Sequence, residues 1–192
     1  VEVALTSLAD VGTAPSTTSG VTGEICVRAA HVKDRYDSLW ITERAASRHP
    51  GWHRTGDVGH LDDEGRLWVE GRLAHLVTTA DGVLTPVGVE QRVESLAEVR
   101  AAAAVGVGPA GTQALVLVVV TAEPRRRRPG RALGLTPADH DLADAVRRAA
   151  GVPVAAVLRA GRLPLDIRHA SKVDRLEVAR QAGRLLAGRG AR

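Results

Sequence analysis

Short hydrophobic runs separated by polar, glycine-rich stretches mark the beginning of the chain. Residues 1–10 and 23–28 each predict a short β-strand, and the Gly, Ser and Thr-rich stretch 12–23 between them predicts an exposed loop. A polar segment with a helical pattern follows at residues 41–47, and a strand-like pattern returns at residues 52–61. This part of the chain is therefore predicted to be rich in strands.

Two predicted hairpins divide the middle of the chain. Thr55-Gly56-Asp57 is interpreted as a turn or the end of a strand. The Asp-Asp-Glu-Gly sequence at residues 62–65 predicts a hairpin turn, because Asp and Gly tolerate positive φ, and residues 67–70 are predicted to form the returning strand. A second, smaller hairpin is predicted at residues 76–85, turned at an Asp-Gly pair. The segment between the hairpins, residues 71–74, is a candidate domain boundary.

Beyond this boundary the pattern predicts helices that cover a sheet. Thr85 has the position of a helix N-cap and Pro86 that of the first helical residue. Residues 100–107 and 114–121 predict strands, and the second is a nearly continuous Val and Leu run that we expect to be a central strand buried on both faces. The inner face of the first helix is predicted to carry Val89, Val93 and Leu96.

The end of the chain continues this alternation. The Thr-Pro-Ala-Asp sequence at residues 136–139 is interpreted as a capping box that opens a helix through Ala150. Residues 154–159 predict a further strand, and Asp174 is placed to cap a last helix that stops at Gly188. The predicted fold class is α+β, with a β-rich domain at residues 1–71. The second predicted domain, residues 72–192, contains a β-hairpin and a mixed sheet flanked by helices.

Composition agrees with a folded protein and excludes several classes. Of the 192 residues, 44% are hydrophobic and 25% charged, which is too apolar for general disorder, and no run approaches the roughly 20 apolar residues of a membrane span. The net charge of +4 comes from arginines at 125–128, Arg131 and the C-terminal residues, without the interleaved aromatic residues or recognition helix expected of nucleic-acid binding. Cys26 is the only cysteine, which excludes an internal disulfide and a zinc site with several thiolates and fits a reducing cytoplasm.

The most specific motif spans residues 51–72. Residues 51–59 read Gly-Trp-His-Arg-Thr-Gly-Asp-Val-Gly, and they are followed by Leu-Asp-Asp-Glu-Gly-Arg-Leu at 61–67 and by Gly71-Arg72. In order and spacing this resembles the adenylate-forming superfamily of acyl-CoA synthetases, luciferases and peptide-synthetase adenylation domains. The resemblance implies that residues 1–71 end a large β-barrel-containing domain that binds ATP and the acyl group. Residues 72–192 would then form a mobile C-terminal lid.

The resemblance also implies roles for individual residues. Asp57 matches the aspartate that binds the ribose, and an ionised carboxylate can accept a hydrogen bond from each of two adjacent hydroxyls. Arg72 matches an arginine that reaches the ribose and phosphate region, where its permanently charged fork suits the task. Val69 would lie near the adenine. Ala74 occupies the hinge position, where relatives usually carry Asp or Lys.

A lysine near the C-terminus completes the resemblance. The segment from Leu163-Pro164 to Ser171-Lys172-Val173-Asp174-Arg175 is similar to the family ending L-P-x-T-x-x-G-K-x-x-R, although it is two residues longer and carries Ser171 in place of Gly. Lys172 would be the catalytic lysine, whose ammonium stabilises the negative charge that develops as the acid attacks ATP. ATP and AMP are the implied nucleotides. Mg²⁺ would arrive with ATP on ligands outside this chain, and no metal site is predicted within it.

The departures from the common pattern resemble the olefin-biosynthesis branch, the β-lactone synthetases. They are found at residues 71–82 and 166–172, and they put the use of coenzyme A in doubt. This resemblance implies a long-chain 2-alkyl-3-hydroxy acid whose own hydroxyl closes the lactone after ATP activation. Residues that would serve this second step or support Lys172 are His75, Asp166, Arg168 and His169, although a salt bridge that holds the loop explains the last three equally well.

Two other functions stay open from the sequence. A fatty acyl-CoA ligase would use the same nucleotide residues with a thiol in the second step. A non-catalytic module that docks other enzymes of a pathway is a hypothesis of another class, and the arginines at 125–128 are its only sequence feature. The phosphate loop and the Mg²⁺ ligand of the family are absent from this sequence. We therefore expect the chain to be the C-terminal portion of a longer enzyme and to be inactive by itself.

Overall fold

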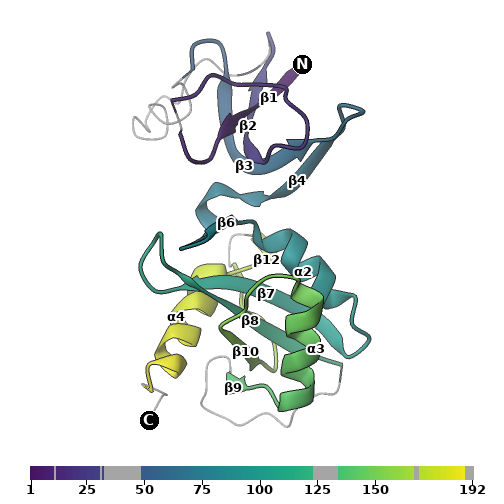
Figure 1. The fold of residues 1–192 in the computed structure, drawn as a ribbon, viewed down its shortest axis with the longest axis vertical. Coiled ribbons are helices and arrows are strands. Elements are labelled where there is room, and N and C mark those ends of the chain that lie inside the picture. Colours follow the sequence, from purple (N-terminus) through teal and green to yellow (C-terminus); the bar gives the residue numbers. More distant parts are fainter. Residues whose placement is uncertain (11, 31, 33–48, 123–133, 167–168, 189–192) are drawn as a thin grey trace. The chain divides into compact units, whose positions relative to one another are not determined.

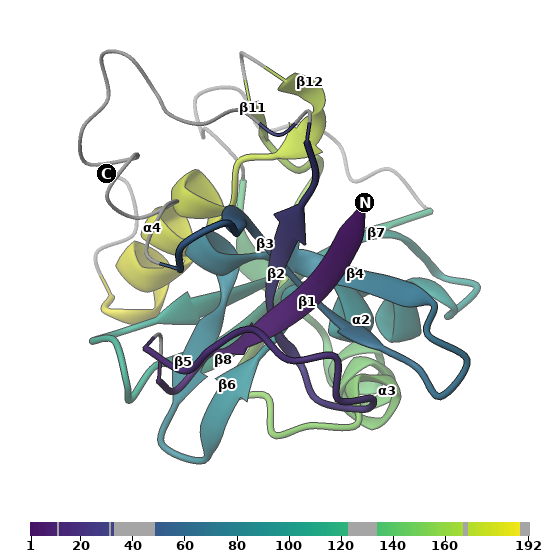
Figure 2. The same ribbon diagram turned by 90° about the horizontal axis from the view of Figure 1, so that it is seen from above.

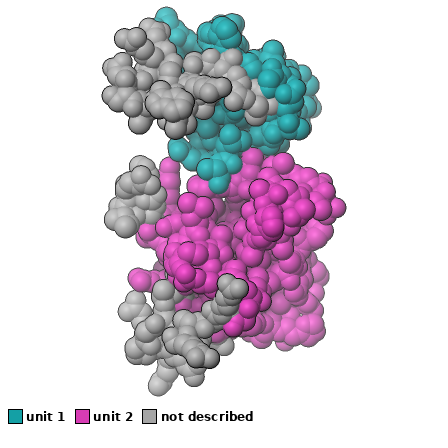
Figure 3. Space-filling model, turned by 90° about the vertical axis from the view of Figure 1, so that its left-hand side faces the viewer, with its two compact units in different colours: residues 1–74 teal, residues 75–192 magenta. Residues whose placement is uncertain are grey.

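The computed structural model describes residues 1–10, 12–30, 32, 49–122, 134–166 and 169–188, and the chain divides into two compact units. Unit 1 is Val1–Ala74 and unit 2 is His75–Arg192 (Figure 3). The sequence predicts a candidate boundary at residues 71–74, with the domains divided between residues 71 and 72. The predicted helix at 41–47 and the arginines at 125–128 lie outside the described residues. No described helix is long and apolar enough to cross a membrane.

Unit 1 is built on an antiparallel sheet with the strand order β1-β2-β3-β4 (Figure 1). The turn between β3 and β4 is confirmed where the sequence predicts it, since Gly65 has a φ of 73° and its N–H donates to the Asp62 carbonyl at 2.9 Å. Leu5, Ile25 and Leu61 form the hydrophobic cluster of this sheet. The strands are β1 (Glu2–Ser7), β2 (Gly23–Arg28), β3 (His53–Leu61) and β4 (Leu67–Arg72).

The Thr55-Gly56-Asp57 sequence lies inside β3, so its interpretation as a turn or strand end is wrong. Pairing with β2 continues on both sides of it, because Arg54 pairs with Cys26 and Val58 pairs with Glu24. The register shifts between these two pairs, and Gly56 has a φ of 76°, which glycine adopts without steric cost. The tripeptide is therefore a bulge in a continuous strand.

The main sheet of unit 2 has the strand order β7-β8-β10-β9. Strand β8 is an inner strand buried on both faces, as its Val and Leu run predicts: Leu115 and Leu117 join one hydrophobic cluster, whereas Val116 and Val118 join another. It pairs antiparallel with β7 and parallel with β10. The strands are β7 (Val99–Val107), β8 (Ala114–Thr121), β9 (Thr136–Pro137) and β10 (Ala156–Arg159).

Helices cover both faces of this sheet. Helices α2 (Pro86–Glu94) and α3 (His140–Ala150) pack on one face, and α4 (Arg175–Leu186) packs on the other (Figures 1 and 2). Thr85 is the N-cap of α2, as predicted, although its side chain makes no capping hydrogen bond. Asp174 caps α4, because its carboxylate accepts the Glu177 N–H at 3.0 Å.

The predicted capping box at residues 136–139 is wrong. Asp139 is the N-cap of α3 and accepts the Leu142 N–H at 3.1 Å. Thr136–Pro137 forms β9 instead, because these residues pair with Arg159 and Leu158 of β10. Pairing with a distant strand therefore decides the conformation of these residues.

Two small hairpins complete unit 2. The hairpin of β5 (Val77–Thr79) and β6 (Gly82–Leu84) is confirmed, and Gly82 has a φ of 132°. The pairing of β11 (Leu165–Asp166) with β12 (His169–Val173) has no counterpart among the sequence predictions. The described residues thus form a mixed α/β fold with sheets and three α-helices.

Candidate functional site

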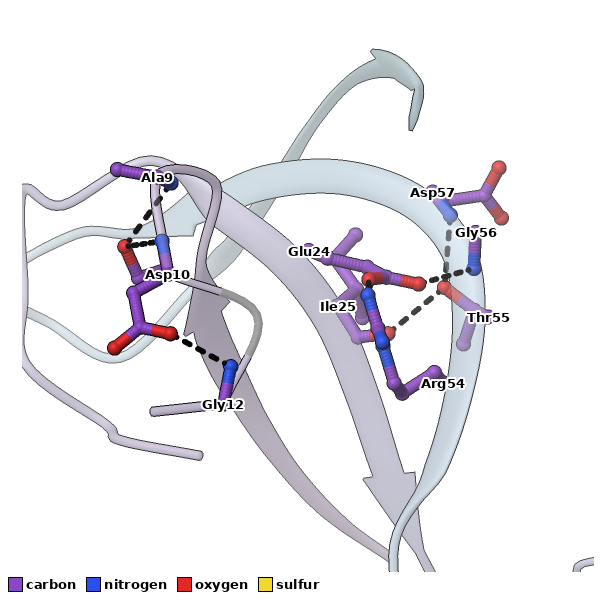
Figure 4. A network of polar contacts seen from close by, with 10 residues as sticks. Ala9, Asp10, Gly12, Glu24, Ile25, Arg54, Thr55, Gly56 and Asp57 are labelled. Carbon is purple, nitrogen blue, oxygen red and sulfur yellow. Dashed lines mark hydrogen bonds and ion pairs between the residues drawn. The ribbon is translucent and has the colours of Figure 1, made fainter. Parts of the chain in front are cut away.

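A buried ion pair between Glu24 and Arg54 holds the β3 bulge in place (Figure 4). The Glu24 carboxylate accepts the Arg54 Nε–H at 2.7 Å and also bonds its Nη2, and both side chains are almost fully buried. The second oxygen of Glu24 accepts the Gly56 N–H at 3.2 Å. Since one carboxylate binds both the strand and the bulge, the position of the bulge depends on Glu24.

Thr55 fixes the other side of the bulge. Its hydroxyl donates to the Ile25 carbonyl at 2.9 Å and accepts the Asp57 N–H at 3.0 Å. These bonds orient the Asp57 backbone, and Figure 4 shows the Asp57 carboxylate pointing away from the Glu24 cluster. The bulge therefore presents a carboxylate whose backbone is fixed by its neighbours.

Asp57 and Arg72, two of the predicted nucleotide-binding residues, lie side by side. They are paired across β3 and β4, and the Arg72 Nε is 3.0 Å from the Asp57 Oδ1. The Asp57 side chain is 36% exposed and the Arg72 side chain 57% exposed. A half-buried acceptor beside an exposed cation can bind a ligand that carries both hydroxyl and phosphate groups.

Val69 lies on the same strand as Arg72, where it pairs with Gly59 of β3, and it is 58% exposed. A strand residue that only packs in the core would be buried. Because Val69 is exposed instead, its apolar side chain is accessible to a ligand. Its neighbour Trp68 stacks on His60 with the ring planes 9° apart. Trp68 is itself 53% exposed and adds aromatic surface to this hairpin.

Ala74 and His75 lie at the division between the units, in a short 3-10 helix of Leu73–His75. Ala74 is exposed and His75 is half-buried. The position expected to act as a hinge thus coincides with the place where the chain passes from one compact unit to the other.

Lys172 lies in unit 2, on β12, and is exposed. Its strand is fixed at both sides, since Val173 pairs with Leu165 of β11 and the Asp174 N–H donates to the Pro164 carbonyl at 2.9 Å. Val173 also packs against the hydrophobic cluster beneath α4. An exposed ammonium group therefore stands on an anchored segment immediately before a helix.

The other predicted residues of this segment are placed only by their backbone. Asp166 pairs with His169 across β11 and β12, and Arg168 lies outside the described residues. The described residues contain no cluster of three or more metal-ligating side chains.

Glu24 and Arg54 support the candidate site but were not singled out from the sequence. Arg54 stands within the motif at 51–59 and is buried, and a buried guanidinium requires an anionic partner. Nothing in the sequence indicates that the partner is Glu24, because this pairing depends on the register of β2 with β3.

The chain is similar in sequence to known synthetases and ligases. No protein-family model matches the chain. The chain is 40% identical over 173 residues to the olefin β-lactone synthetase of Xanthomonas campestris pv. campestris, covering 84% of this chain and 30% of that protein. It is 35% identical over 119 residues to the indoleacetate–CoA ligase of Aromatoleum aromaticum, covering 60% of this chain and 23% of that protein. The chain thus spans less than a third of the length of these relatives.

The fold is also similar to a solved structure. An amide bond synthetase from Marinactinospora thermotolerans superposes with a TM-score of 0.72 at 25% sequence identity. The match covers 93% of this chain and 33% of that chain. The similarity therefore includes both compact units of the chain and a limited part of the solved protein.

Proposed function

We propose, from the membership of this chain in the adenylate-forming ligases, that it is the carboxy-terminal part of an enzyme that activates a carboxylic acid with ATP. The paired Asp57 and Arg72 on an exposed hairpin carry this proposal, together with the exposed Lys172 on its anchored strand. Unit 1 would end the large ATP-binding and acyl-binding domain, including its barrel. Unit 2 would be the lid that brings Lys172 to the substrate.

The nucleotide would bind at the β3–β4 hairpin. The Asp57 carboxylate accepts hydrogen bonds from the two ribose hydroxyls, and Arg72 lies beside it to reach the ribose and the phosphates. Val69 offers exposed apolar surface to the adenine on the same strand. Mg²⁺ would accompany the ATP phosphates and neutralise part of their charge, and no described residue is assigned to it.

Lys172 would act in the first step. A carboxylate oxygen of the acid attacks the α-phosphorus of ATP, the bond from that phosphorus to the bridging oxygen breaks, and pyrophosphate leaves with the electron pair. Negative charge grows on the α-phosphate oxygens during this step, and an ammonium group placed beside them stabilises it. The product is an acyl-adenylate.

The second step would close a β-lactone. The 3-hydroxyl oxygen of a long-chain 2-alkyl-3-hydroxy acid attacks the acyl carbon, the bond from this carbon to the AMP oxygen breaks, and AMP leaves. The hydroxyl proton passes to a base. His75, Asp166, Arg168 and His169 are the candidate residues for this proton or for the support of Lys172. Because nucleophile and acyl group belong to one molecule, the ring closure gains from proximity.

Transfer to coenzyme A is the second candidate function. The relative from Aromatoleum aromaticum is a CoA ligase and favours it, whereas the higher identity and larger coverage of the olefin β-lactone synthetase favour ring closure. Both candidates share the first step and the residues assigned to it. They differ only in the nucleophile that displaces AMP.

Product analysis distinguishes the two. The complete ligase that carries this chain is given ATP, Mg²⁺ and a 2-alkyl-3-hydroxy acid, with and without coenzyme A, and the products are measured by mass spectrometry. We expect a β-lactone without coenzyme A and its loss in Lys172→Ala. A thioester formed only with coenzyme A would refute lactone closure and leave the roles of Asp57, Arg72 and Lys172 in place.

A further inference from the structure

Arg175 is the first residue of α4. Only Val173 and the N-cap Asp174 separate it from Lys172. A cation is unfavourable at this end of a helix, because the exposed N–H groups of the first turn already give it a positive potential. The Arg175 side chain is only 17% exposed, and its Nε is buried without a hydrogen-bond partner among the described residues. Helix propensity and solvation therefore do not explain why an arginine stands there.

Glu90 compensates this charge. Its Oε2 lies 2.6 Å from the Arg175 Nη2, and its side chain is 10% exposed. A charge pair so far removed from water is not weakened by solvent to the extent of a surface pair. The pair therefore fixes the first turn of α4 and with it the end of the strand that carries Lys172.

The same carboxylate is also bound to the main sheet. The Oε1 of Glu90 accepts the Ala104 N–H of β7 at 2.8 Å, and this contact is buried. Strand β7 is at the edge of its sheet, and α2 and α4 cover opposite faces of that sheet. Glu90 thus joins both helices at the sheet edge through one carboxylate.

We propose that Glu90 and Arg175 are positioning residues for Lys172: they hold the β12–α4 junction against the sheet edge so that the lysine is presented in one orientation. This inference rests on the catalytic role proposed for Lys172. Neither residue touches the substrate in this account. They act by removing alternative positions of the segment, which matters because small misplacements of a catalytic group cost large factors in rate.

The structure supplies a matched control on the same helix. Glu94 lies one turn after Glu90, and its Oε1 accepts the Ala102 N–H of the same edge strand at 2.8 Å. No ion pair of Glu94 with α4 is seen among the described residues. Glu90→Gln and Glu94→Gln therefore remove the same charge from the same helix and perturb the same strand, but only the first breaks the link to Arg175.

The test measures acid-dependent exchange of pyrophosphate into ATP by the complete ligase. We expect Glu90→Gln and Arg175→Gln to lower kcat by about 10–100-fold with the KM for ATP unchanged, and Glu94→Gln to change kcat by less than about 3-fold. Arg175→Lys, which keeps the charge, is expected to recover most of the rate. In the Lys172→Ala background, Glu90→Gln is expected to cause no further loss. Thermal unfolding of each variant verifies that it is folded.

Four outcomes would contradict the positioning role or the catalytic role on which it rests. Equal effects of Glu90→Gln and Glu94→Gln, or a full additional loss in the Lys172→Ala background, would overturn the positioning role alone. Wild-type exchange in Lys172→Ala would overturn the catalytic role of the lysine, and the positioning role with it. If Glu90→Gln is too unstable to assay, Arg175→Lys is compared with Arg175→Gln. An exchange rate of Arg175→Lys no higher than that of Arg175→Gln would also overturn the positioning role.

Discussion

Glu24 is the residue on which the conformation of the β3 bulge depends most strongly. Its carboxylate accepts the Nε–H and an Nη2–H of Arg54 and, at 3.2 Å, the N–H of Gly56. Glu24→Gln keeps the size of the side chain and removes its charge. The guanidinium group then stays in the interior of unit 1 without an anion, and an amide N–H₂ group competes for the same space.

The expected cost follows from burial. The side chains of Arg54 and Glu24 are 6% and 5% exposed, so solvent can replace little of the lost interaction. Removing one partner of such a pair costs about 3–5 kcal/mol, because the other charge stays buried. Replacing both residues by Leu is expected to recover most of this loss, since the desolvation cost of both charges disappears.

Tryptophan fluorescence during urea unfolding measures this effect in unit 1. All three tryptophans of the chain, at positions 40, 52 and 68, belong to residues 1–74. Glu2→Gln is the matched control, because Glu2 also pairs with an arginine, Arg28, but at the surface. We expect no measurable change for the control. A loss below about 1 kcal/mol for Glu24→Gln would refute the reasoning, since it would mean that the pair is solvated.

Three further predictions concern Gly59, Glu177 and Cys26. In Gly59→Ala the new Cβ would lie 2.2 Å from the Trp68 carbonyl oxygen, so β3 and β4 must separate and the fluorescence-detected stability is expected to fall by about 1–3 kcal/mol. A hydrogen bond from Arg180 lowers the pKa of Glu177 from 4.5 to about 2. The ionised Glu177 therefore contributes its full stabilisation of the fold above pH 4.5 and loses it as the pH falls through about 2. Glu177→Gln should flatten the pH dependence of unfolding in this window, as followed by circular dichroism. Burial raises the pKa of the Cys26 thiol, so native protein should react with iodoacetamide far more slowly than protein in urea, as measured by mass spectrometry.

Local patterns predict the regular elements of this fold well. The two-sided burial of β8 follows from its continuous Val and Leu run, and the turn at Gly65 follows from the need for positive φ. Such features depend on neighbours in the sequence. The helix caps at Thr85 and Asp174 belong to the same class, because the capping position is defined within one turn of the chain.

Contacts between distant segments account for the errors. Thr55-Gly56-Asp57 reads as a turn in isolation, but pairing with β2 on both sides keeps it within a strand. Thr136–Pro137 reads as part of a helix cap, but it pairs with β10 and forms a strand. In both places a partner far along the chain overrides the local preference.

The candidate site also contains residues that the sequence indicates and residues that only distant contacts reveal. The family resemblance of the motif makes Asp57 and Arg72 candidates, and the hairpin between them explains why they meet. The residues that hold the site, Glu24 and Glu90, could not be recognised, because their partners are set by strand register and by helix packing around a sheet edge.

The origin of the oxygen atoms in AMP tests the central proposal most directly. The complete ligase is given a 2-alkyl-3-hydroxy acid labelled with ¹⁸O in its carboxylate, and the AMP released is analysed by mass spectrometry. If the acid is activated as an acyl-adenylate, one labelled oxygen stays on the phosphorus, and AMP carries a single ¹⁸O atom whichever nucleophile completes the reaction. AMP without label, or release of ADP and phosphate, would contradict the account.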